Sequence, residues 1–365
     1  MESRIAAGFI REAVDNRVYE FSWPRNSVAV LPFRMQDTEL MKLISKKVIE
    51  MQPITYFFPN YDHSRSREAR RTIVHIQNGI GDIWAFSSVA KFLDHLPMQI
   101  HVTKKFHPLF DWYERRDVQL RDYYQSIATD YNATNRLTKY QYWRRLGLEN
   151  ATKQYGTGNW FEAHYKRLNI DTTPEGFDRP RLRTDRVWPQ ASHIDAQHSV
   201  LICHRSSCQM RSSKLEDFYW PVKNALPGYH VYVHASDLTD EDLQFCRRHR
   251  SITVIPPTDL QQLLLNAYDA TIVVSTDSQA LHFREGIGRP ALGVFGAMTA
   301  ASRCSGYLYT RAFDVRTGCP HQPCVIHENK KGEVCTNANP GDLVARCQSG
   351  PDFQQQLYQE LKAMR

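Results

Sequence analysis

A strand that ends in hydroxyl and carboxyl side chains gives this sequence its clearest chemical signal. Residues 270–296 read ATIVVSTDSQALHFREGIGRPALGVFG, an apolar strand that leads through Ser275–Ser278 into a helix. Asp277 or Ser278 can cap that helix, whose free backbone N–H groups and dipole then favour the binding of an anion. His282 lies about one and a half turns further along, at a wall of the same cleft. The alternative is an ordinary capped helix with a histidine in the core.

A second carboxylate follows an earlier strand. Thr72–Ile76 is apolar, Gly79–Asp82 reads as a tight turn, and a helix is predicted over 84–96. A carboxylate at such a turn can act as a general base that takes a proton from a hydroxyl group. The alternative is that Asp82 only caps the helix that follows.

Cations follow a third strand, over 199–203. Arg205, Arg211 and Lys214 lie in the loop that connects this strand to a segment rich in aromatic residues. A guanidinium fork or an ammonium group there can stabilise the negative charge of a bound anion. The alternative is a solvated basic loop, which is a stronger rival for the two arginines than for Lys214.

Alternating strands and helices must position these groups. Further strands are predicted over 98–102, 230–234, 252–255, 270–274 and 290–295, and helices over 259–268, 279–286 and 353–364. This order predicts two doubly wound α/β domains in tandem, in which ligands bind at the carboxyl ends of the strands. Segments 59–71 and 179–191 read as linkers, and 110–185 is expected to be helical with loops.

Composition excludes several classes of protein. The 365 residues are 42 % hydrophobic and 23 % charged, which argues against a disordered or fibrous chain. The formal net charge of +7 favours an anionic ligand or surface, such as a nucleotide, a nucleic acid or a lipid head group. No apolar run approaches the roughly 18–20 residues that cross a bilayer, and the first residues lack the order of a secretory signal. We therefore expect a cytoplasmic protein without a transmembrane segment.

The segment 277–296 resembles the donor-site signature of glycosyltransferase family 9, the bacterial ADP-heptose:lipopolysaccharide heptosyltransferases and their relatives. The matching features are the acidic and hydroxyl pair, the histidine, Gly-x-Pro and the strand that ends in Phe-Gly. The sequence departs from the signature at Gln279, where glycine is usual, and at Phe283 and Arg284, where small residues are usual. A weaker match covers the strand at 72–76 and its Gly-x-Gly-Asp turn.

This resemblance implies a GT-B fold, in which two Rossmann-like domains face a cleft, and an inverting transfer that uses no catalytic metal. It implies that Asp82, next to Gly81, is the general base. Lys214 matches the lysine that contacts the donor diphosphate, and Arg205 and Arg211 can add to that contact. The remaining donor-binding residues that it implies are His234, Asp277, Ser278, Gln279 and His282.

We expect three parts in the chain. Residues 1–71 are an N-terminal extension and linker, 72–190 the acceptor-side domain, and 191–365 the nucleotide-sugar-binding domain with a cysteine-rich loop over 319–347. The resemblance implies a nucleotide-diphosphate sugar as substrate, with ADP-heptose as the first candidate. The acceptor is then a hydroxyl group of a glycan, a protein or another macromolecule.

Four of the eight cysteines gather in the C-terminal loop. Cys319, Cys324, Cys335 and Cys347 are separated by 4, 10 and 11 residues. Four thiolates in a loop rich in Gly, Pro and Asn can hold a structural zinc or iron. The heptosyltransferases that modify autotransporters resemble this chain in having four cysteines, which hold an iron, and an N-terminal extension. The alternative is unpaired thiols in a reducing compartment.

Aromatic and basic residues interleave over 110–167, including Trp112, Tyr113 and Arg115. Such residues suit the faces of sugars or bases and a phosphorylated acceptor, although an aromatic core with a solvated charged face explains them as well. Two rival functions stay open. One is a glycosyltransferase that acts on hydroxymethylated bases in DNA, which the positive charge permits, and the other is a nucleotide-binding module without catalysis. A homo-oligomer also stays open.

Overall fold

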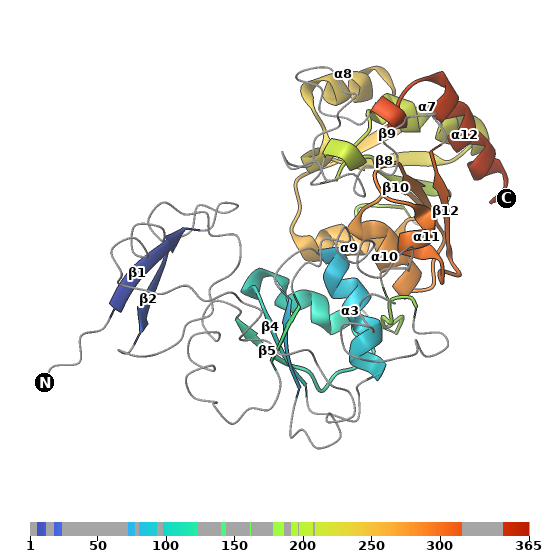
Figure 1. The fold of residues 1–365 in the computed structure, drawn as a ribbon. Helices are drawn as coiled ribbons and strands as arrows, with labels where there is room; N and C mark the ends of the chain where they lie inside the picture. The colour runs from blue at the N-terminus through green and yellow to red at the C-terminus, as the bar shows by residue number, and fades with distance from the viewer. Residues whose placement is uncertain are drawn as a thin grey trace, which may run out of the picture.

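Two parallel sheets form the framework of the protein (Figure 1). The computed structural model describes residues 6–11, 18–23, 72–76, 80–92, 98–122, 140–143, 161, 178–185, 191–195, 197–206, 209–315 and 346–364. Near the N-terminus, β1 (Ala6–Arg11) and β2 (Val18–Trp23) form an antiparallel pair. The rest of the predicted extension lies outside the described residues.

The larger sheet has six parallel strands in the order β12-β11-β10-β7-β8-β9. Its strands are β7 (Ser199–Cys203), β8 (His230–His234), β9 (Ile252–Ile255), β10 (Ile272–Thr276), β11 (Ala291–Phe295) and β12 (Thr310–Asp314). Numbered along the chain, this is the doubly wound order 3-2-1-4-5-6. The strand order reverses between β7 and β10, so a ligand is expected beyond the carboxyl ends of these two strands.

The smaller sheet repeats the first part of this order. Its four parallel strands run β5-β4-β3-β6, and the reversal falls beside β3. The strands are β3 (Thr72–Ile76), β4 (Met98–Val102), β5 (Gln119–Asp122) and β6 (Tyr140–Trp143). The helix α3 follows β3 directly and therefore begins at the carboxyl edge of its sheet.

Helices cover the sheets and begin where strands end. They are α3 (Ile80–Phe92), α7 (Leu215–Ala225), α8 (Asp240–Arg248), α9 (Leu260–Asp269), α10 (Gln279–Gly286), α11 (Ala300–Cys304) and α12 (Pro351–Lys362). Short 3-10 turns lie at η2 (Lys104–Trp112), η3 (Gln209–Arg211), η4 (Ala235–Asp237) and η5 (Arg346–Gln348). None of the described helices is long and apolar enough to cross a membrane.

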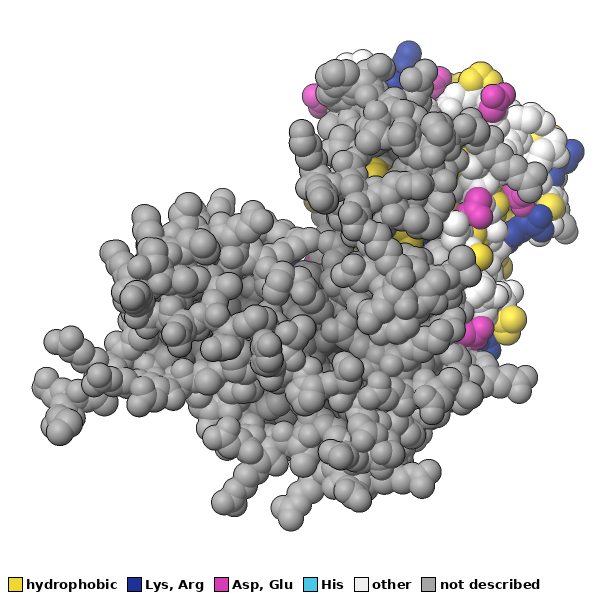
Figure 2. Space-filling model, in the orientation of Figure 1, with side chains coloured by type: hydrophobic (Ala, Val, Ile, Leu, Met, Phe, Trp, Pro, Cys, Tyr) yellow, Lys and Arg dark blue, Asp and Glu magenta, His cyan; other side chains and the backbone are white. Residues whose placement is uncertain are grey.

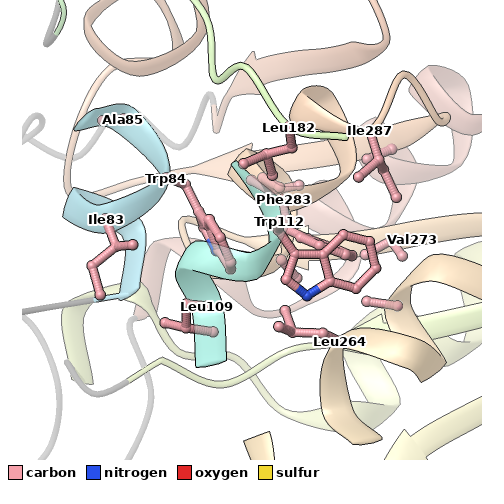
Figure 3. Close-up of a cluster of buried hydrophobic side chains, with 14 of the residues drawn as sticks. Ile83, Trp84, Ala85, Leu109, Trp112, Leu182, Leu264, Val273, Phe283 and Ile287 are labelled. Carbon is pink, nitrogen blue, oxygen red and sulfur yellow. The ribbon is translucent and has the colours of Figure 1, made fainter. Parts of the chain in front are cut away.

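One hydrophobic cluster joins the two sheets. It includes Trp84 on α3, Trp112 in η2 and Phe283 on α10, all fully buried (Figure 3). The ring centroids of Trp112 and Phe283 lie 4.8 Å apart, edge to face, and those of Trp84 and Phe283 lie 5.5 Å apart. A second cluster fills the space between α7, α12 and the six-stranded sheet. The shared first cluster therefore holds the two sheets together through α3 and α10.

The segment predicted as a linker at 179–191 is packed where the structure describes it. The Arg181 backbone N–H donates to Ser87 Oγ of α3 (2.8 Å), and that of Leu182 donates to the Gly286 carbonyl of α10 (3.3 Å). Leu182 lies so close to α10 that a Cβ on Gly286 would stand 2.5 Å from the Leu182 Cγ. Residues 178–185 are thus a strap across α3 and α10.

Most predicted strands and helices are confirmed within a few residues. The expectation of helices over 110–185 is wrong for β5 and β6, which add two strands to the smaller sheet. Acidic and basic side chains are interspersed on the coloured part of the face that Figure 2 shows. On that part of the surface, basic and acidic side chains are therefore not separated into patches of one sign.

Candidate functional site

The starts of α3 and α10 meet. Trp84, in the second turn of α3, donates its indole N–H to Gln279 Oε1 at the first residue of α10 (3.3 Å). Gly81 and Asp82 belong to the first turn of α3, and Asp277 and Ser278 immediately precede α10. This contact brings the two turns singled out in the sequence into one region, at the carboxyl edges of the two sheets.

Asp277 is a buried carboxylate with three basic neighbours. Its Oδ2 lies 3.4 Å from Arg211 Nη1 and 3.6 Å from Arg303 Nε, and its Oδ1 lies 4.0 Å from His282 Nε2. Burial acts to raise the pKa of Asp277, but the charges of Arg303 and Arg211 outweigh it and hold that pKa below its usual value. Asp277 is therefore ionised. Two guanidinium groups thus lie against this carboxylate beside the start of α10.

His282 is fully enclosed behind Asp277. Its Nδ1 lies 2.6 Å from the hydroxyl oxygen of Tyr307. Burial lowers the pKa of His282 to about 3, because it outweighs the charge of Asp277, which raises that pKa, and the charges of Arg303 and Arg211 act in the same direction as burial. The imidazole is therefore neutral at pH 7, so it adds no charge to the site.

Hydroxyl groups shape the turn before α10. Ser278 caps the helix, because its Oγ accepts a hydrogen bond from the Ala280 backbone N–H (3.2 Å). Ser275 Oγ lies 2.7 Å from Ser278 Oγ and donates to the Cys203 carbonyl at the end of β7 (3.2 Å). The turn is thus fixed to the strand beside the point where the order of the sheet reverses.

Lys214 and Arg205 lie with α8 in this structure. Lys214 Nζ pairs with Glu241 (3.1 Å), and both side chains are largely exposed. Arg205 Nη2 lies 3.3 Å from Asp242 Oδ2, and Asp242 Oδ1 accepts the Leu215 N–H at the start of α7 (3.1 Å). The starts of α7 and α8 are joined in this way. The structure thus places Arg211 at Asp277 and places Lys214 and Arg205 at the start of α8.

Two further groups lie near these residues, at the carboxyl ends of β7 and β8. His204 Nε2 is 3.5 Å from Asp242 Oδ2, and contacts with His204 and Thr239 hold the pKa of Asp242 well below its usual value despite burial, which raises it. His234, predicted at the nucleoside, is buried at the end of β8, and burial lowers its pKa to about 4. Asp277 comes directly after β10, and His234 is the last residue of β8. Both therefore lie at the carboxyl ends of the two strands that flank β7.

Two of the three departures from the family signature on α10 are core residues. Phe283 lies in the aromatic cluster of Figure 3. Arg284 is fully buried, and its guanidinium donates at 2.7–3.2 Å to five backbone carbonyls, those of Ala267, Tyr268, Ala270, Thr271 and Pro290. Both side chains thus serve packing, while Gln279 faces α3.

Three residues considered for the acceptor are also core residues. Trp112 and Tyr113 are buried, and the Tyr113 hydroxyl donates to the Ile83 carbonyl of α3. Arg115 is buried as well and pairs with Asp117 (2.6 Å) while donating to the Ala90 carbonyl (3.1 Å). The interpretation of these three as an acceptor surface is wrong, because they hold η2 and the segment after it against α3.

The predicted metal ligands are mostly outside the described residues. Cys319, Cys324 and Cys335 lie there, whereas Cys347 is buried in η5, near Gly296 at the end of β11. Within the described part of the chain, no group of three or more His, Cys, Asp or Glu side chains is arranged to hold a metal ion. The metal site stays a prediction.

Sequence reasoning missed Arg303, Tyr307 and Glu241. Arg303 and Tyr307 follow β11, the strand next to β10, so their loop emerges at the same edge as Asp277. Ligands of such sheets bind beyond the carboxyl ends of the strands, and this rule, applied to β11 as well as to β7 and β10, could have identified this segment. Glu241 begins the helix after β8, where an acidic residue is common for helix stability alone.

Comparison with known proteins shows a likeness of fold. No protein-family model matches the sequence, and no curated protein matches it. A glycosyltransferase of family 9 from Veillonella parvula superposes with a TM-score of 0.52 at 11 % identity, over 81 % of this chain and 98 % of that one. The iron-containing dodecameric glycosyltransferase TibC from enterotoxigenic Escherichia coli H10407 gives 0.53 at 12 %, over 81 % and 77 %.

A second structure of TibC is a complex with ADP-D-beta-D-heptose. It gives a TM-score of 0.51 at 13 % identity, over 81 % of this chain and 74 % of that one. Over four fifths of its length, the chain thus resembles solved glycosyltransferases in fold, among them a member of family 9.

Proposed function

We propose that the protein is a GT-B glycosyltransferase that moves a sugar from a nucleotide-diphosphate donor to a hydroxyl group with inversion. One observation carries this proposal: the Trp84–Gln279 contact joins the Gly81–Asp82 turn to the Asp277–Ser278 turn. A carboxylate and an anion site at adjoining sheet edges are the two requirements of metal-independent sugar transfer. The fold likeness to glycosyltransferases supports the same conclusion.

The donor diphosphate is assigned to the start of α10. Backbone N–H groups there, together with Arg211 and Arg303 around Asp277, favour a bound anion. Lys214 and Arg205 at α8 add positive charge beyond β7, and His234 lies toward the nucleoside. When the anomeric carbon–oxygen bond breaks, the electron pair stays on the diphosphate, and these cations stabilise it.

Asp82 is assigned the role of general base. The acceptor oxygen attacks the anomeric carbon while the Asp82 carboxylate takes its proton, so charge moves from the acceptor side to the leaving diphosphate. ADP-heptose is the first candidate donor, since the sequence resembles family 9 and TibC has been solved with ADP-D-beta-D-heptose. A glycan or protein hydroxyl is the first candidate acceptor, and a homo-oligomer is expected because TibC is dodecameric.

Substitution of Asp82 tests this proposal. We expect Asp82→Asn to bind ADP-heptose as the wild type does and to lose transfer by about 10²-fold or more, the usual share of a general base. Asp352→Asn is the matched control, because Asp352 is an exposed carboxylate in the first turn of α12. Binding is measured by calorimetry and transfer by release of ADP.

A panel of nucleotide sugars, read by thermal shift, identifies the donor. A specific donor raises Tm because it binds the native state alone. Binding without any transfer, with every acceptor class including hydroxymethylated DNA, would favour the nucleotide-binding module. Full transfer activity in Asp82→Asn would remove Asp82 from the mechanism.

A further inference from the structure

Tyr307 lies behind the anion site, in the segment between α11 and β12. Its phenol ring packs edge to face against His282, with ring centroids 5.9 Å apart, and also contacts Phe161 at 6.2 Å. Its hydroxyl oxygen is 2.6 Å from His282 Nδ1. Burial raises the pKa of Tyr307 well above its usual value, so the phenol keeps its proton.

Glu285 fixes the segment that carries Tyr307. Glu285 is buried on α10, three residues after His282, and both therefore lie on one face of the helix. Its carboxylate accepts the backbone N–H groups of Leu308 (2.8 Å), Tyr309 (2.9 Å) and Thr310 (2.9 Å). The Tyr307 N–H itself donates to the Cys304 carbonyl (3.0 Å). The position of the Tyr307 hydroxyl is thus determined by the helix whose histidine it contacts.

The direction of the hydrogen bond follows from what each group can donate. A neutral imidazole has one N–H donor and one acceptor nitrogen. Tyr307 is partly buried and keeps its phenol proton, and among the described residues the acceptor within hydrogen-bond distance of its hydroxyl is His282 Nδ1. The other ring nitrogen, Nε2, lies 4.0 Å from Oδ1 of the ionised Asp277 carboxylate, and this negative charge favours the proton on that nitrogen through electrostatic attraction. Both observations place the imidazole proton on Nε2.

We propose that Tyr307 is a positioning residue that donates its hydroxyl proton to His282 Nδ1, fixes the Nε2–H tautomer and directs that N–H toward the Asp277 carboxylate. The chain Tyr307–His282–Asp277 then supports the carboxylate from behind, while Arg211 and Arg303 contact its other oxygen. The role in transfer rests on the proposed function. The tautomer itself is a property of the protein alone.

The tautomer is measured by long-range proton–nitrogen NMR spectra of the full chain labelled with 15N-histidine. The His282 signals are assigned by their absence in His282→Gln. We expect a single Nε2–H tautomer in the wild type near pH 7.5. A wild-type Nδ1–H tautomer would mean that Tyr307 accepts the bond, and would overturn the proposal without any variant.

Tyr307→Phe removes the hydroxyl and keeps the ring, and Tyr309→Phe is the matched control in the same segment, since Tyr309 is half exposed. We expect Tyr307→Phe to give a mixture of His282 tautomers and Tyr309→Phe to give the wild-type spectrum. An unchanged tautomer in Tyr307→Phe contradicts the proposal.

An activity measurement separates this proposal from the function on which it rests. We expect Tyr307→Phe to lower kcat about 3- to 10-fold, the effect of one hydrogen bond, with KM for the donor nearly unchanged. If the wild type shows the single Nε2–H tautomer but transfers no sugar, the positioning role of Tyr307 still holds. Only the proposed glycosyltransferase activity is then rejected. An unchanged kcat in an active Tyr307→Phe enzyme rejects the catalytic importance of the bond.

Discussion

At the scale of single residues, two histidines, one at the end of β8 and one on α10, are kept neutral by burial. The pKa of His282 is lowered to about 3 and that of His234 to about 4, while an unfolded histidine titrates near 6.5. Asp277, whose pKa is lowered by its arginines, stays charged. The anion site therefore keeps one charge state across the neutral range.

These pKa values predict acid sensitivity. Between about pH 6.5 and pH 4 the unfolded chain takes up a proton at each histidine and the folded chain does not, so the free energy of unfolding falls as pH falls. The expected slope is about 1.4 kcal/mol per pH unit for each histidine. Asp277 acts the same way only below about pH 4, where its unfolded carboxyl begins to protonate.

Urea unfolding of wild type, His282→Gln and His234→Gln between pH 7.5 and 4.5 checks this slope. Each single substitution should lower the slope by about 1.4 kcal/mol per pH unit, the contribution of one proton. The double variant should lower it by twice that amount. Equal slopes in all four proteins would show that neither histidine has a depressed pKa.

At the scale of elements, the strap over 178–185 depends on a missing side chain. Gly286 at the end of α10 leaves room for Leu182, which is buried between α10 and α3. A Cβ at Gly286 would stand 2.5 Å from Leu182 Cγ, closer than real contacts, and 3.1 Å from Pro180 Cβ, which is tighter than most real contacts. The absence of a side chain at the end of α10 therefore allows the strap to pack there.

A double-mutant cycle tests this contact. Gly286→Ala should destabilise the protein by about 1–3 kcal/mol through overpacking, and Leu182→Ala by about 2–5 kcal/mol through a cavity. In the double variant the new methyl group occupies part of the cavity, so the loss should be smaller than the sum by about 1 kcal/mol. Additive losses in chemical denaturation would disprove direct contact.

Elements with local signals could be predicted from the sequence, and those without could not. The bounds of α10, Gln279–Gly286, agree with the prediction because Ser278 caps the helix and a Gly-rich turn ends it. The strand β5, with the sequence QLRD, was missed because it is short and polar. The role of Arg284 could not be predicted, since its carbonyl partners lie far from it in the sequence and no local pattern reveals them. The turn that contains Asp277 could be identified from the sequence. Its partner Arg303 could be identified only by also considering β11, the strand beside β10.

At the scale of the whole molecule, one core serves both sheets. The cluster that contains Trp84, Trp112 and Phe283 continues from the smaller sheet through α3 and α10 into the larger one (Figure 3). Two domains with separate cores would be free to unfold separately, but this shared cluster couples them. The sheets should therefore lose their structure together.

Calorimetry and urea titration test this coupling. We expect one transition, seen at the same midpoint by circular dichroism and by tryptophan fluorescence. Trp112→Ala should cost about 3–5 kcal/mol and separate the two midpoints, because it removes the ring between η2 and α10. Phe353→Ala is the control from the other cluster and should lower stability while the midpoints still coincide. Two separate transitions in the wild type would contradict a common core.

The buried Arg284 has a consequence for how this protein can change over time. Its guanidinium ties the rear of α10 to five carbonyls around the end of α9 and the start of β11, independently of anything bound in front. Substitutions at the start of α10, for example at Gln279, therefore act on a helix whose position Arg284 already fixes. Ligand preference at the proposed donor site can therefore change by mutation at that edge while the fold is retained, whereas a lysine in place of Arg284 would lose the planar guanidinium fork that holds the helix.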